Sequence, residues 1–470
     1  MPSTWPVLLR SRVAWACVAV IVGASWLLTW RWQDSLEHPM ELDGSRAELE
    51  VPQTASATLG SLEAWFPPLD EAIDSGGFRR VEAHNARHMR NLLRCMQAKT
   101  CGKNQRKVVI LEDLYLGMVL RGTDWLGGEM IWANSTVNAL QTLGYTYFFA
   151  RQWDQVLSFH NMFPDLVVAV VMSPETMTGC WGDKYGCVKS PHNPNGIPIW
   201  KILTFYFWGN EISPLDGRWV LSPEPWGTYG TGYPNTYLGY SIDERCTRHA
   251  FVPTQTRERR AYLLTKFLRF LVHNDYDGDP AWPADVWQRL TNELDVTLVA
   301  SIKIDVMPDD SPLPAGLPAG IVRLPELGPE EFVDELAKSR VLIGLGNPRT
   351  SPTPYEALCM GVPFINPVLS WNEHDPDDTS QWTCQHETLC RYGPGPPYVY
   401  NVKRGDRHAL IAAIQAALDH PIERYILEMT KQSAVVERLD AILSQDRLGM
   451  ARELLQQREE GTRQGELFDL

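Results

Sequence analysis

Residues 261–367 alternate between short apolar runs and amphipathic stretches. Of all features of the sequence, this alternation most narrows the range of possible folds. Apolar runs without polar interruption are typical of strands that are buried on both faces, and spacing of three or four residues between apolar positions is typical of helices. The expected strands are 261–268, 295–302, 341–345 and 362–367, and the expected helices are 283–294, 329–339 and 352–361. Strands that alternate with helices at this spacing predict a parallel, doubly wound sheet.

The first half of the chain repeats this pattern. Its apolar runs predict strands at 107–116, 145–150 and 166–172, and helical spacing occurs over 62–97 and over 129–143, where Gly144 ends the helix. Residues 173–240 are rich in Pro, Gly and Trp, and a segment of this length is expected to cover a site. Two closing helices are expected over 406–420 and about 425–443.

Composition narrows the class of protein. The chain has 470 residues, which suits two or three domains, and 44% are hydrophobic, enough to form cores. Its net charge is −14 and it has no long basic run. Because phosphate backbones are bound by clustered Lys and Arg, no nucleic-acid partner is expected.

An apolar, charge-free segment lies at residues 13–30. Its length is at the lower end for a membrane-spanning helix, and Arg10 and Arg12 precede it, which predicts a short cytoplasmic tail (1–12) and a lumenal body. A cleaved signal peptide with its cleavage site near Gly23–Ser25 is the alternative. The anchor is favoured because the apolar run continues beyond that site. Residues 31–84, which are polar up to about residue 60, are expected to form a stem.

Eight cysteines lie beyond residue 30, an even number that suggests disulfides in an oxidising compartment. Three close pairs stand out: Cys95/Cys101, Cys180/Cys187 and Cys384/Cys390. Cys359, inside an apolar helix, is equally consistent with a buried thiol.

The segment at 341–367 is the most informative for function. A buried strand leads into a loop that contains Gly344 and Gly346, and then into a helix with Pro354 in its first turn. Ligands of parallel sheets bind at the carboxyl ends of strands, and the free N–H groups of a helix N-terminus suit a diphosphate. Glu356, one turn into the helix, could accept hydrogen bonds from ribose hydroxyls, although such a strand–loop–helix also occurs as a purely structural turn.

This pattern, G-L-G-x-P, then P-x-P-x-E-A, then G-x-x-F-x-N-P, resembles the donor site of the N-acetylglucosaminyltransferase V family (alpha-1,6-mannosylglycoprotein 6-beta-N-acetylglucosaminyltransferase). Three further segments match the family in the same order. They are GGEMIWANSTVNALQTLGY at 127–145, NTYLGYSIDE at 235–244 and the residues that lead into the donor loop from Ile321. The resemblance covers about residues 105–443, with gaps around 150–230.

The resemblance implies a GT-B fold, in which two Rossmann-like domains face a cleft. It also implies an inverting reaction, UDP-N-acetylglucosamine as donor, no required metal or cofactor, and a glycan acceptor, with an N-glycan mannose as the family's own acceptor. The expected domains are an acceptor-binding domain (85–240), a nucleotide-sugar-binding domain (241–420) and C-terminal helices and tail (421–470), with the last helix packed back on the first domain. The expected location is the Golgi membrane, as a single-pass type II protein.

The family's catalytic base falls on Glu129. Independently of the family, an inverting transfer needs a carboxylate that takes the proton of the attacking hydroxyl, and Glu129 follows Gly127-Gly128 at the start of a helix. A first-turn glutamate that only complements the helix dipole is the structural alternative.

One position departs from the family. Its usual lysine after the N-P of the donor strand is Val368 here. Arg349 in the donor loop or Lys266 at the end of a strand could instead balance the charge of the leaving diphosphate, and Lys266 also matches a family lysine.

Three alternatives follow from the sequence. Asp275, Asp277 and Asp279 could bind manganese, although acidic Gly- and Pro-containing turns are more often solvated. A retaining GT-B enzyme would have a similar donor loop and would not depend on Glu129. A catalytically inactive, membrane-anchored glycan-binding protein is suggested by Val368.

Overall fold

The computed structural model describes residues 77–122, 127–182, 186–207, 213–225, 235–275, 277–305, 307 and 316–470. The chain divides into two compact units, 1–57 and 58–470, and all described residues belong to the second. The expected anchor at 13–30 lies outside the described residues, as does most of the expected stem. Within the described ranges, no helix is long and apolar enough to cross a membrane.

The first sheet is wholly parallel, in the order β2-β1-β3-β4-β5-β6. Its strands are β1 Val108–Glu112, β2 Thr146–Phe149, β3 Val167–Met172, β4 Ile202–Phe205, β5 Val220–Ser222 and β6 Thr236–Tyr237. The helices of this part are α3 Phe78–Ala98, α4 Leu114–Arg121, α5 Gly128–Leu143, α6 Trp153–Met162 and α7 Pro174–Trp181. The strands predicted at 145–150 and 166–172 are confirmed, and so is the end of α5 at Gly144, which takes a left-handed φ of 73°. The strand predicted at 107–116 is too long, because β1 ends at Glu112 and the Asp113 carboxylate caps α4, which begins at Leu114.

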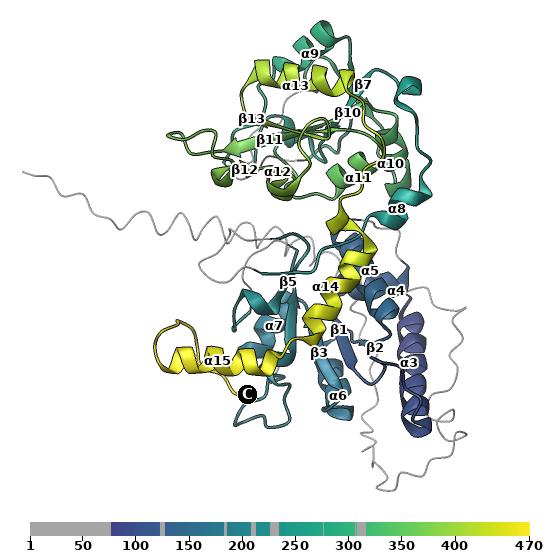
Figure 1. Ribbon diagram of the computed structural model, residues 1–470, viewed down its shortest axis with the longest axis vertical. Helices are drawn as coiled ribbons and strands as arrows, with labels where there is room; N and C mark the ends of the chain where they lie inside the picture. The colour runs from purple at the N-terminus through teal and green to yellow at the C-terminus, as the bar shows by residue number, and fades with distance from the viewer. Residues whose placement is uncertain are drawn as a thin grey trace, which may run out of the picture. The chain divides into compact units, whose positions relative to one another are not determined.

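The second sheet follows the order β12-β11-β10-β7-β8-β9, and β13 pairs in parallel with β11. Only β12 is antiparallel to its neighbour among the described strands. The strands are β7 Arg260–Leu264, β8 Thr297–Ser301, β9 Ile321–Leu324, β10 Val341–Gly344, β11 Phe364–Ser370, β12 Thr383–Cys384 and β13 Val399–Lys403. The helices are α8 Asp243–Arg248, α9 Val286–Leu294, α10 Pro329–Ala337, α11 Thr353–Cys359, α12 Glu387–Tyr392 and α13 Arg407–Asp419. Figure 1 shows α9 and α13 on one face of this sheet and α11 and α12 on the other.

These two sheets confirm the predicted α/β class with parallel strands. The first sheet lies within the predicted 85–240 range, and the second lies within 241–420. Short 3-10 segments complete the described structure: η2 Ile199–Lys201, η3 Gly217–Trp219, η4 Thr254–Thr256, η5 Leu268–Leu271, η6 Thr379–Gln381 and η7 Glu428–Thr430.

The chain ends with α14 Gln432–Ser444 and α15 Arg447–Glu459. As expected of the last helix, α14 returns to the first sheet's part of the chain and runs beside α5 (Figure 1). Gln432 Nε2 donates to the Ser135 carbonyl at 3.0 Å, and Arg438 Nε donates to the Leu238 carbonyl at 2.6 Å. These contacts join α14 to α5 and to the residue that follows β6.

Four disulfides join the eight cysteines of this part of the chain. The three close pairs are bonded as expected: Cys95–Cys101, Cys180–Cys187 and Cys384–Cys390. The interpretation of Cys359 as a buried thiol is wrong, because Cys359 in α11 is bonded to Cys246 in α8. The two residues are 113 positions apart, so their spacing carried no signal.

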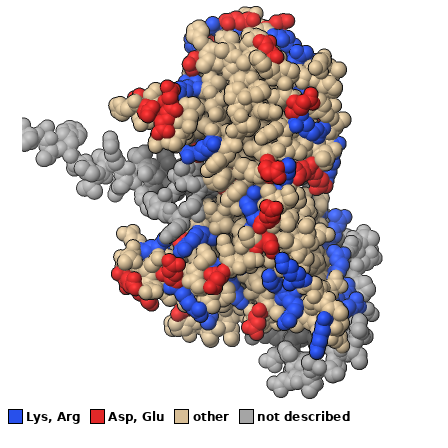
Figure 2. All heavy atoms as spheres, in the orientation of Figure 1, with Lys and Arg blue, Asp and Glu red and all other residues tan. Residues whose placement is uncertain are grey.

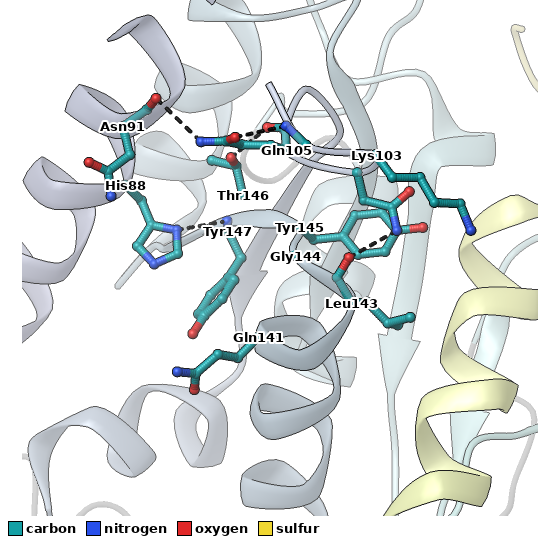
Figure 3. A pocket seen from close by; sticks show the side chains of 12 residues that line it. His88, Asn91, Lys103, Gln105, Gln141, Leu143, Gly144, Tyr145, Thr146 and Tyr147 are labelled. Atoms are coloured by element: carbon teal, nitrogen blue, oxygen red, sulfur yellow. Dashed lines mark hydrogen bonds between the residues drawn. The ribbon is translucent and has the colours of Figure 1, made fainter. Parts of the chain in front are cut away.

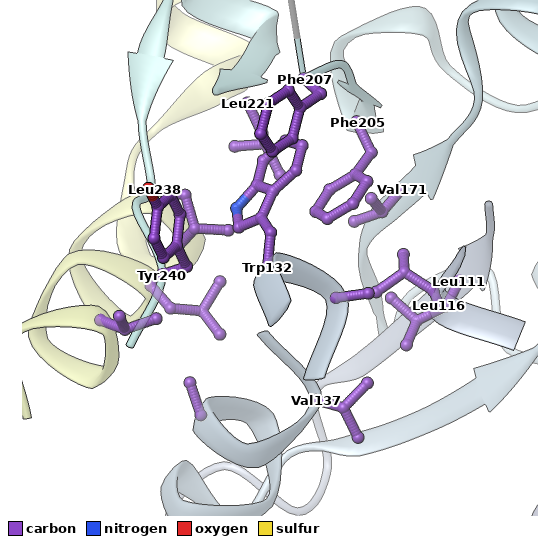
Figure 4. Close-up of a cluster of buried hydrophobic side chains, with 14 of the residues drawn as sticks. Leu111, Leu116, Trp132, Val137, Val171, Phe205, Phe207, Leu221, Leu238 and Tyr240 are labelled. Atoms are coloured by element: carbon purple, nitrogen blue, oxygen red, sulfur yellow. The ribbon is translucent and has the colours of Figure 1, made fainter. Parts of the chain in front are cut away.

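The core of the first sheet includes an aromatic group around Trp132 of α5. The indole is 1% exposed and stacks on Phe205 with ring centroids 3.5 Å apart, and Phe207 meets it edge-on at 6.1 Å. Figure 4 shows these rings together with Leu221 and Leu238. Trp132 lies one turn after Glu129, so this packing holds the N-terminal end of α5 in place.

Candidate functional site

Glu129 lies in the first turn of α5, directly after Gly127 and Gly128. A Cβ on Gly128 would lie 3.1 Å from Pro352 Cδ and 3.0 Å from Phe207 Cζ, closer than side chains normally pack. The absence of a side chain at Gly128 therefore lets the start of α5 approach Pro352, the residue at which α11 begins. This approach brings the predicted base next to the predicted donor loop.

The Glu129 carboxyl has a perturbed acidity. Burial raises its pKa above the ordinary value, while its own backbone N–H and the positive charge of Lys266 oppose that rise. A raised pKa suits a carboxylate that must accept a proton near neutral pH. The interaction with Lys266 shows that the structure brings these two predicted site residues, from different sheets, close enough to influence each other.

Lys266 follows the end of β7 and is exposed. In the second sheet the order changes direction at β7, whose neighbours are β8 on one side and β10 on the other. Such a change of direction creates a crevice at the carboxyl ends of parallel strands, where ligands of this fold class bind. Lys266 and the donor loop after β10 both lie at this edge.

The structure explains why two positions of the donor loop, 344 and 346, are occupied by glycine. A Cβ on Gly344 would lie 2.2 Å from Gln385 Oε1, and Gly346 has φ 90°, a conformation that favours glycine. The Gly346 N–H donates to Gln385 Oε1 at 2.9 Å, so this N–H is engaged within the protein. Both glycines thus allow the loop to fold against one side chain.

Gln385 was not predicted, yet it organises the donor loop. Its side-chain Nε2 donates to the Pro348 carbonyl at 3.0 Å, and its main-chain carbonyl accepts from the Thr350 N–H at 3.0 Å. Thr350 has φ 51°, which is uncommon for a β-branched residue and persists only where neighbouring contacts hold it. No sequence pattern marks Gln385, since it lies in an irregular segment 35 residues after the loop that it supports.

Pro354 lies in the first turn of α11 as predicted. Glu356, in the same helix, is buried, and Arg245 Nε of α8 lies 3.0 Å from its Oε1. Burial raises the pKa of Glu356, and Arg245 opposes the rise. Because Cys246–Cys359 joins the same two helices, Glu356 contributes to the α8–α11 contact, and its predicted hydrogen bonds to a ribose remain a prediction.

Arg349 is almost buried and forms an ion pair with Glu387 of α12. Its charge is therefore compensated within the protein. Val368, at the position that departs from the family, is fully buried in β11 and is register-paired with Lys403 of β13. Of the two cations suggested by the sequence, Lys266 is exposed, whereas Arg349 is paired with Glu387.

The acidic turn at 275–279 is engaged in ion pairs. Arg269 Nε lies 3.1 Å from Asp275 Oδ1, and Arg404 pairs with Asp277. Charges of both signs are also interspersed on the face that Figure 2 shows. These pairs favour the interpretation of 275–279 as a surface turn.

Two further acidic residues lie at the C-terminal end of β1: Glu112 is its last residue, and Asp113 follows directly. Glu112 accepts from Thr176 Oγ1 at 2.9 Å, and Asp113 caps α4 by accepting from the Tyr115 N–H at 2.8 Å. Burial raises the pKa of Glu112 to about 8 and that of Asp113 to about 7. The sequence analysis predicts a strand at 107–116 and names neither residue as a candidate for the site. Two acids directly after a buried strand nevertheless indicate a possible functional site.

A pocket of about 310 Å³ lies elsewhere, at the amino ends of β1 and β2. Figure 3 shows His88, Gln105, Gln141 and Tyr147 around it. It adjoins the C-terminal end of α5, which is about 20 Å from Glu129 at 1.5 Å per helical residue. This pocket is separate from the candidate site.

The sequence profile of Glycosyltransferase family 18 matches residues 283–456, which is less than half of the chain. The match includes the donor loop and α11, and it leaves out Lys266 and Glu129. No curated protein sequence matches the chain significantly. The profile match confirms the predicted enzyme class, a glycosyltransferase, and is consistent with the family resemblance of the donor-site pattern.

Several solved structures are similar to the chain at low identity. AviGT4, a glycosyltransferase involved in avilamycin A biosynthesis, is 13% identical, with 73% of this chain and 98% of that chain covered and a TM-score of 0.42. Sucrose-phosphate synthase from Thermosynechococcus elongatus is 10% identical, with coverage of 76% and 100% and a TM-score of 0.39. UDP-N-acetylglucosamine 2-epimerase from Rickettsia bellii is 11% identical, with coverage of 74% and 98% and a TM-score of 0.39. TM-scores of this size support no conclusion about this chain.

Proposed function

We propose that this protein is an inverting glycosyltransferase of GT-B architecture that transfers N-acetylglucosamine from UDP-N-acetylglucosamine to a glycan hydroxyl. The observation that carries the proposal is the approach of Gly128, beside Glu129, to Pro352 at the start of α11. This approach places a carboxylate with a raised pKa next to a loop that lies within the glycosyltransferase profile match. An N-glycan mannose is the acceptor that the family resemblance suggests.

In the proposed reaction, the acceptor oxygen attacks the anomeric carbon from the face opposite the diphosphate. The bond between the anomeric carbon and the phosphate oxygen breaks, and its electron pair leaves with UDP. The acceptor hydroxyl passes its proton to the Glu129 carboxylate, which makes the oxygen a better nucleophile as the new bond forms. Attack from the opposite face inverts the anomeric configuration.

Lys266 supplies positive charge at the site. It is exposed at the carboxyl edge of the second sheet and acts electrostatically on Glu129. A cation at this place stabilises the charge that develops on the leaving diphosphate. We assign this role to Lys266 in preference to Arg349, whose charge is compensated by Glu387.

The proposal includes the cellular setting predicted from the sequence. The chain is anchored in the Golgi membrane by residues 13–30, with its body in the lumen. Four disulfides in the described part support an oxidising compartment.

Transfer is expected to proceed without a divalent metal. In the presence of excess EDTA, release of UDP from UDP-N-acetylglucosamine with a glycan acceptor should stay within about twofold of the untreated rate, since protein groups balance the leaving charge. A coupled assay of UDP release, with manganese added back in a parallel sample, measures this. Loss of transfer in EDTA that manganese restores would contradict a metal-independent site and would direct attention to Asp275 and Asp277.

A further inference from the structure

Glu224 is a buried carboxylate that the proposed chemistry does not use. It follows β5 in the first sheet and is only 2% exposed. Three hydroxyl groups donate to it: Tyr240 Oη to Oε1 at 2.8 Å, Tyr355 Oη to Oε2 at 3.0 Å, and Thr388 Oγ1 to Oε2 at 2.6 Å. All three donors are therefore satisfied by one side chain.

The donors come from different parts of the chain. Tyr240 follows β6 of the first sheet, whereas Tyr355 belongs to α11 and Thr388 to α12, both of which pack on the second sheet. Glu224 is thus a direct hydrogen-bonded link from the first sheet to the helix that begins at the donor loop. Tyr355 is itself 1% exposed and adjoins Glu356 in α11.

A second set of contacts holds α11 from another direction. Cys359 is bonded to Cys246, and Glu356 lies against Arg245, so these contacts join α11 to α8. The link to Glu224 differs because it reaches the sheet that carries α5 and Glu129. The link therefore joins the part of the chain that holds the base to the helix that follows the donor loop.

Burying Glu224 has an energetic cost. Burial raises the pKa of Glu224 to about 7, although the three hydroxyl groups and the charge of Arg438 of α14 favour its ionised form. Apolar side chains of similar size could hold two surfaces together without that cost, but hydrogen bonds to a carboxylate fix orientation as well as contact. The arrangement is thus suited to setting geometry.

We propose that Glu224 is a positioning residue, which sets the place of α11 and the donor loop relative to Glu129 through Tyr355 and Thr388. The inference rests on the proposed function, since it assigns the donor to the loop that leads into α11. It deepens that function by adding a residue that acts through Tyr355 and Thr388.

The test compares two tyrosines that donate to the same carboxylate. Tyr355→Phe removes one of the two hydrogen bonds that Glu224 accepts from the second sheet's helices, and Tyr240→Phe removes the one that it accepts within the first sheet's part of the chain. We expect the KM for UDP-N-acetylglucosamine to rise about tenfold in Tyr355→Phe, because a hydrogen bond to a charged group contributes on this scale. In Tyr240→Phe this KM should change less than about twofold, because the lost hydrogen bond does not involve α11. The KM for the acceptor should change little in both variants.

Thr388→Val provides a second interruption of the link and should raise the donor KM in the same direction. Urea denaturation of each variant shows whether Tyr355→Phe and Tyr240→Phe lose similar stability, so that a difference in KM reports position. Equal donor KM values in the two tyrosine variants, beside normal wild-type transfer, would overturn the role of Glu224 and leave the proposed function intact. If the wild-type full chain neither transfers nor hydrolyses any nucleotide-sugar, the proposed function fails, and the inference fails with it.

Discussion

Glu129→Gln is expected to lower the rate of sugar transfer by at least about 100-fold, the usual contribution of a positioned proton acceptor. The amide keeps the shape of the side chain but cannot take the proton of the acceptor hydroxyl. Affinity for the donor should change little, because the donor loop belongs to the second sheet. Initial rates at saturating donor and acceptor, together with a donor titration, measure both effects.

Glu175→Gln is the matched control. Glu175 also lies in the first turn of a helix, α7, which follows a strand of the same sheet, and it is exposed. Its replacement should leave the transfer rate within a few-fold of wild type. Near-normal turnover of a folded Glu129→Gln variant would contradict the base assignment and favour a retaining mechanism.

Glu356→Gln would test hydrogen bonding to the donor, but it should also lower the stability of the fold. It removes the negative charge that faces Arg245 in a buried contact, and an unpaired buried charge is strongly destabilising. The exposed Lys266 is therefore the cleaner position for examining the donor side of the site by mutation.

Trp132→Ala is expected to lower the free energy of unfolding by about 3–5 kcal/mol, the usual range when a large buried ring is removed. The indole stacks on Phe205 at 3.5 Å, and its Nε1 has no hydrogen-bond partner among the described residues. The loss should therefore come from packing alone. Urea denaturation followed by far-UV circular dichroism gives the midpoint and the slope from which this change is calculated.

Trp132→Phe is the control for this substitution. A phenyl ring can still stack on Phe205, so the variant should lose clearly less stability than Trp132→Ala. If Trp132→Ala and Trp132→Phe lower the free energy of unfolding by the same small amount, the aromatic group around Trp132 does not determine the stability of α5.

The strands that could be predicted from the sequence are those whose residues are apolar without interruption. Val108–Glu112, Val167–Met172 and Val341–Gly344 are buried almost throughout, as expected of central strands in a parallel sheet. Strands β5 and β6 could not be predicted, because they have only three and two residues and lie in a segment rich in Pro, Gly and Trp. Strand β9 was missed because its residues are partly exposed, and so carry no clear pattern.

The candidate site could likewise be predicted only in part from the sequence. Glu129 and Pro354 could be placed at helix starts because Gly, Pro and the apolar spacing mark helix boundaries. The contacts that organise the site join residues far apart in the chain, such as Glu224 with Tyr355, which are 131 positions apart. Single-sequence patterns report local structure, so contacts of this kind could be found only in the folded chain.

Inverting transfer from a nucleotide-sugar is distinguished from retaining transfer by the anomeric configuration of the product. The full chain is incubated with UDP-N-acetylglucosamine, whose sugar is α-linked, and a mannose-containing glycan, and the new linkage is identified by proton NMR from its anomeric coupling constant. We predict an inverting transfer, which gives a β-linked N-acetylglucosamine. An α-linked product would contradict it, because retention of configuration requires a mechanism in which Glu129 is not the base that activates the acceptor.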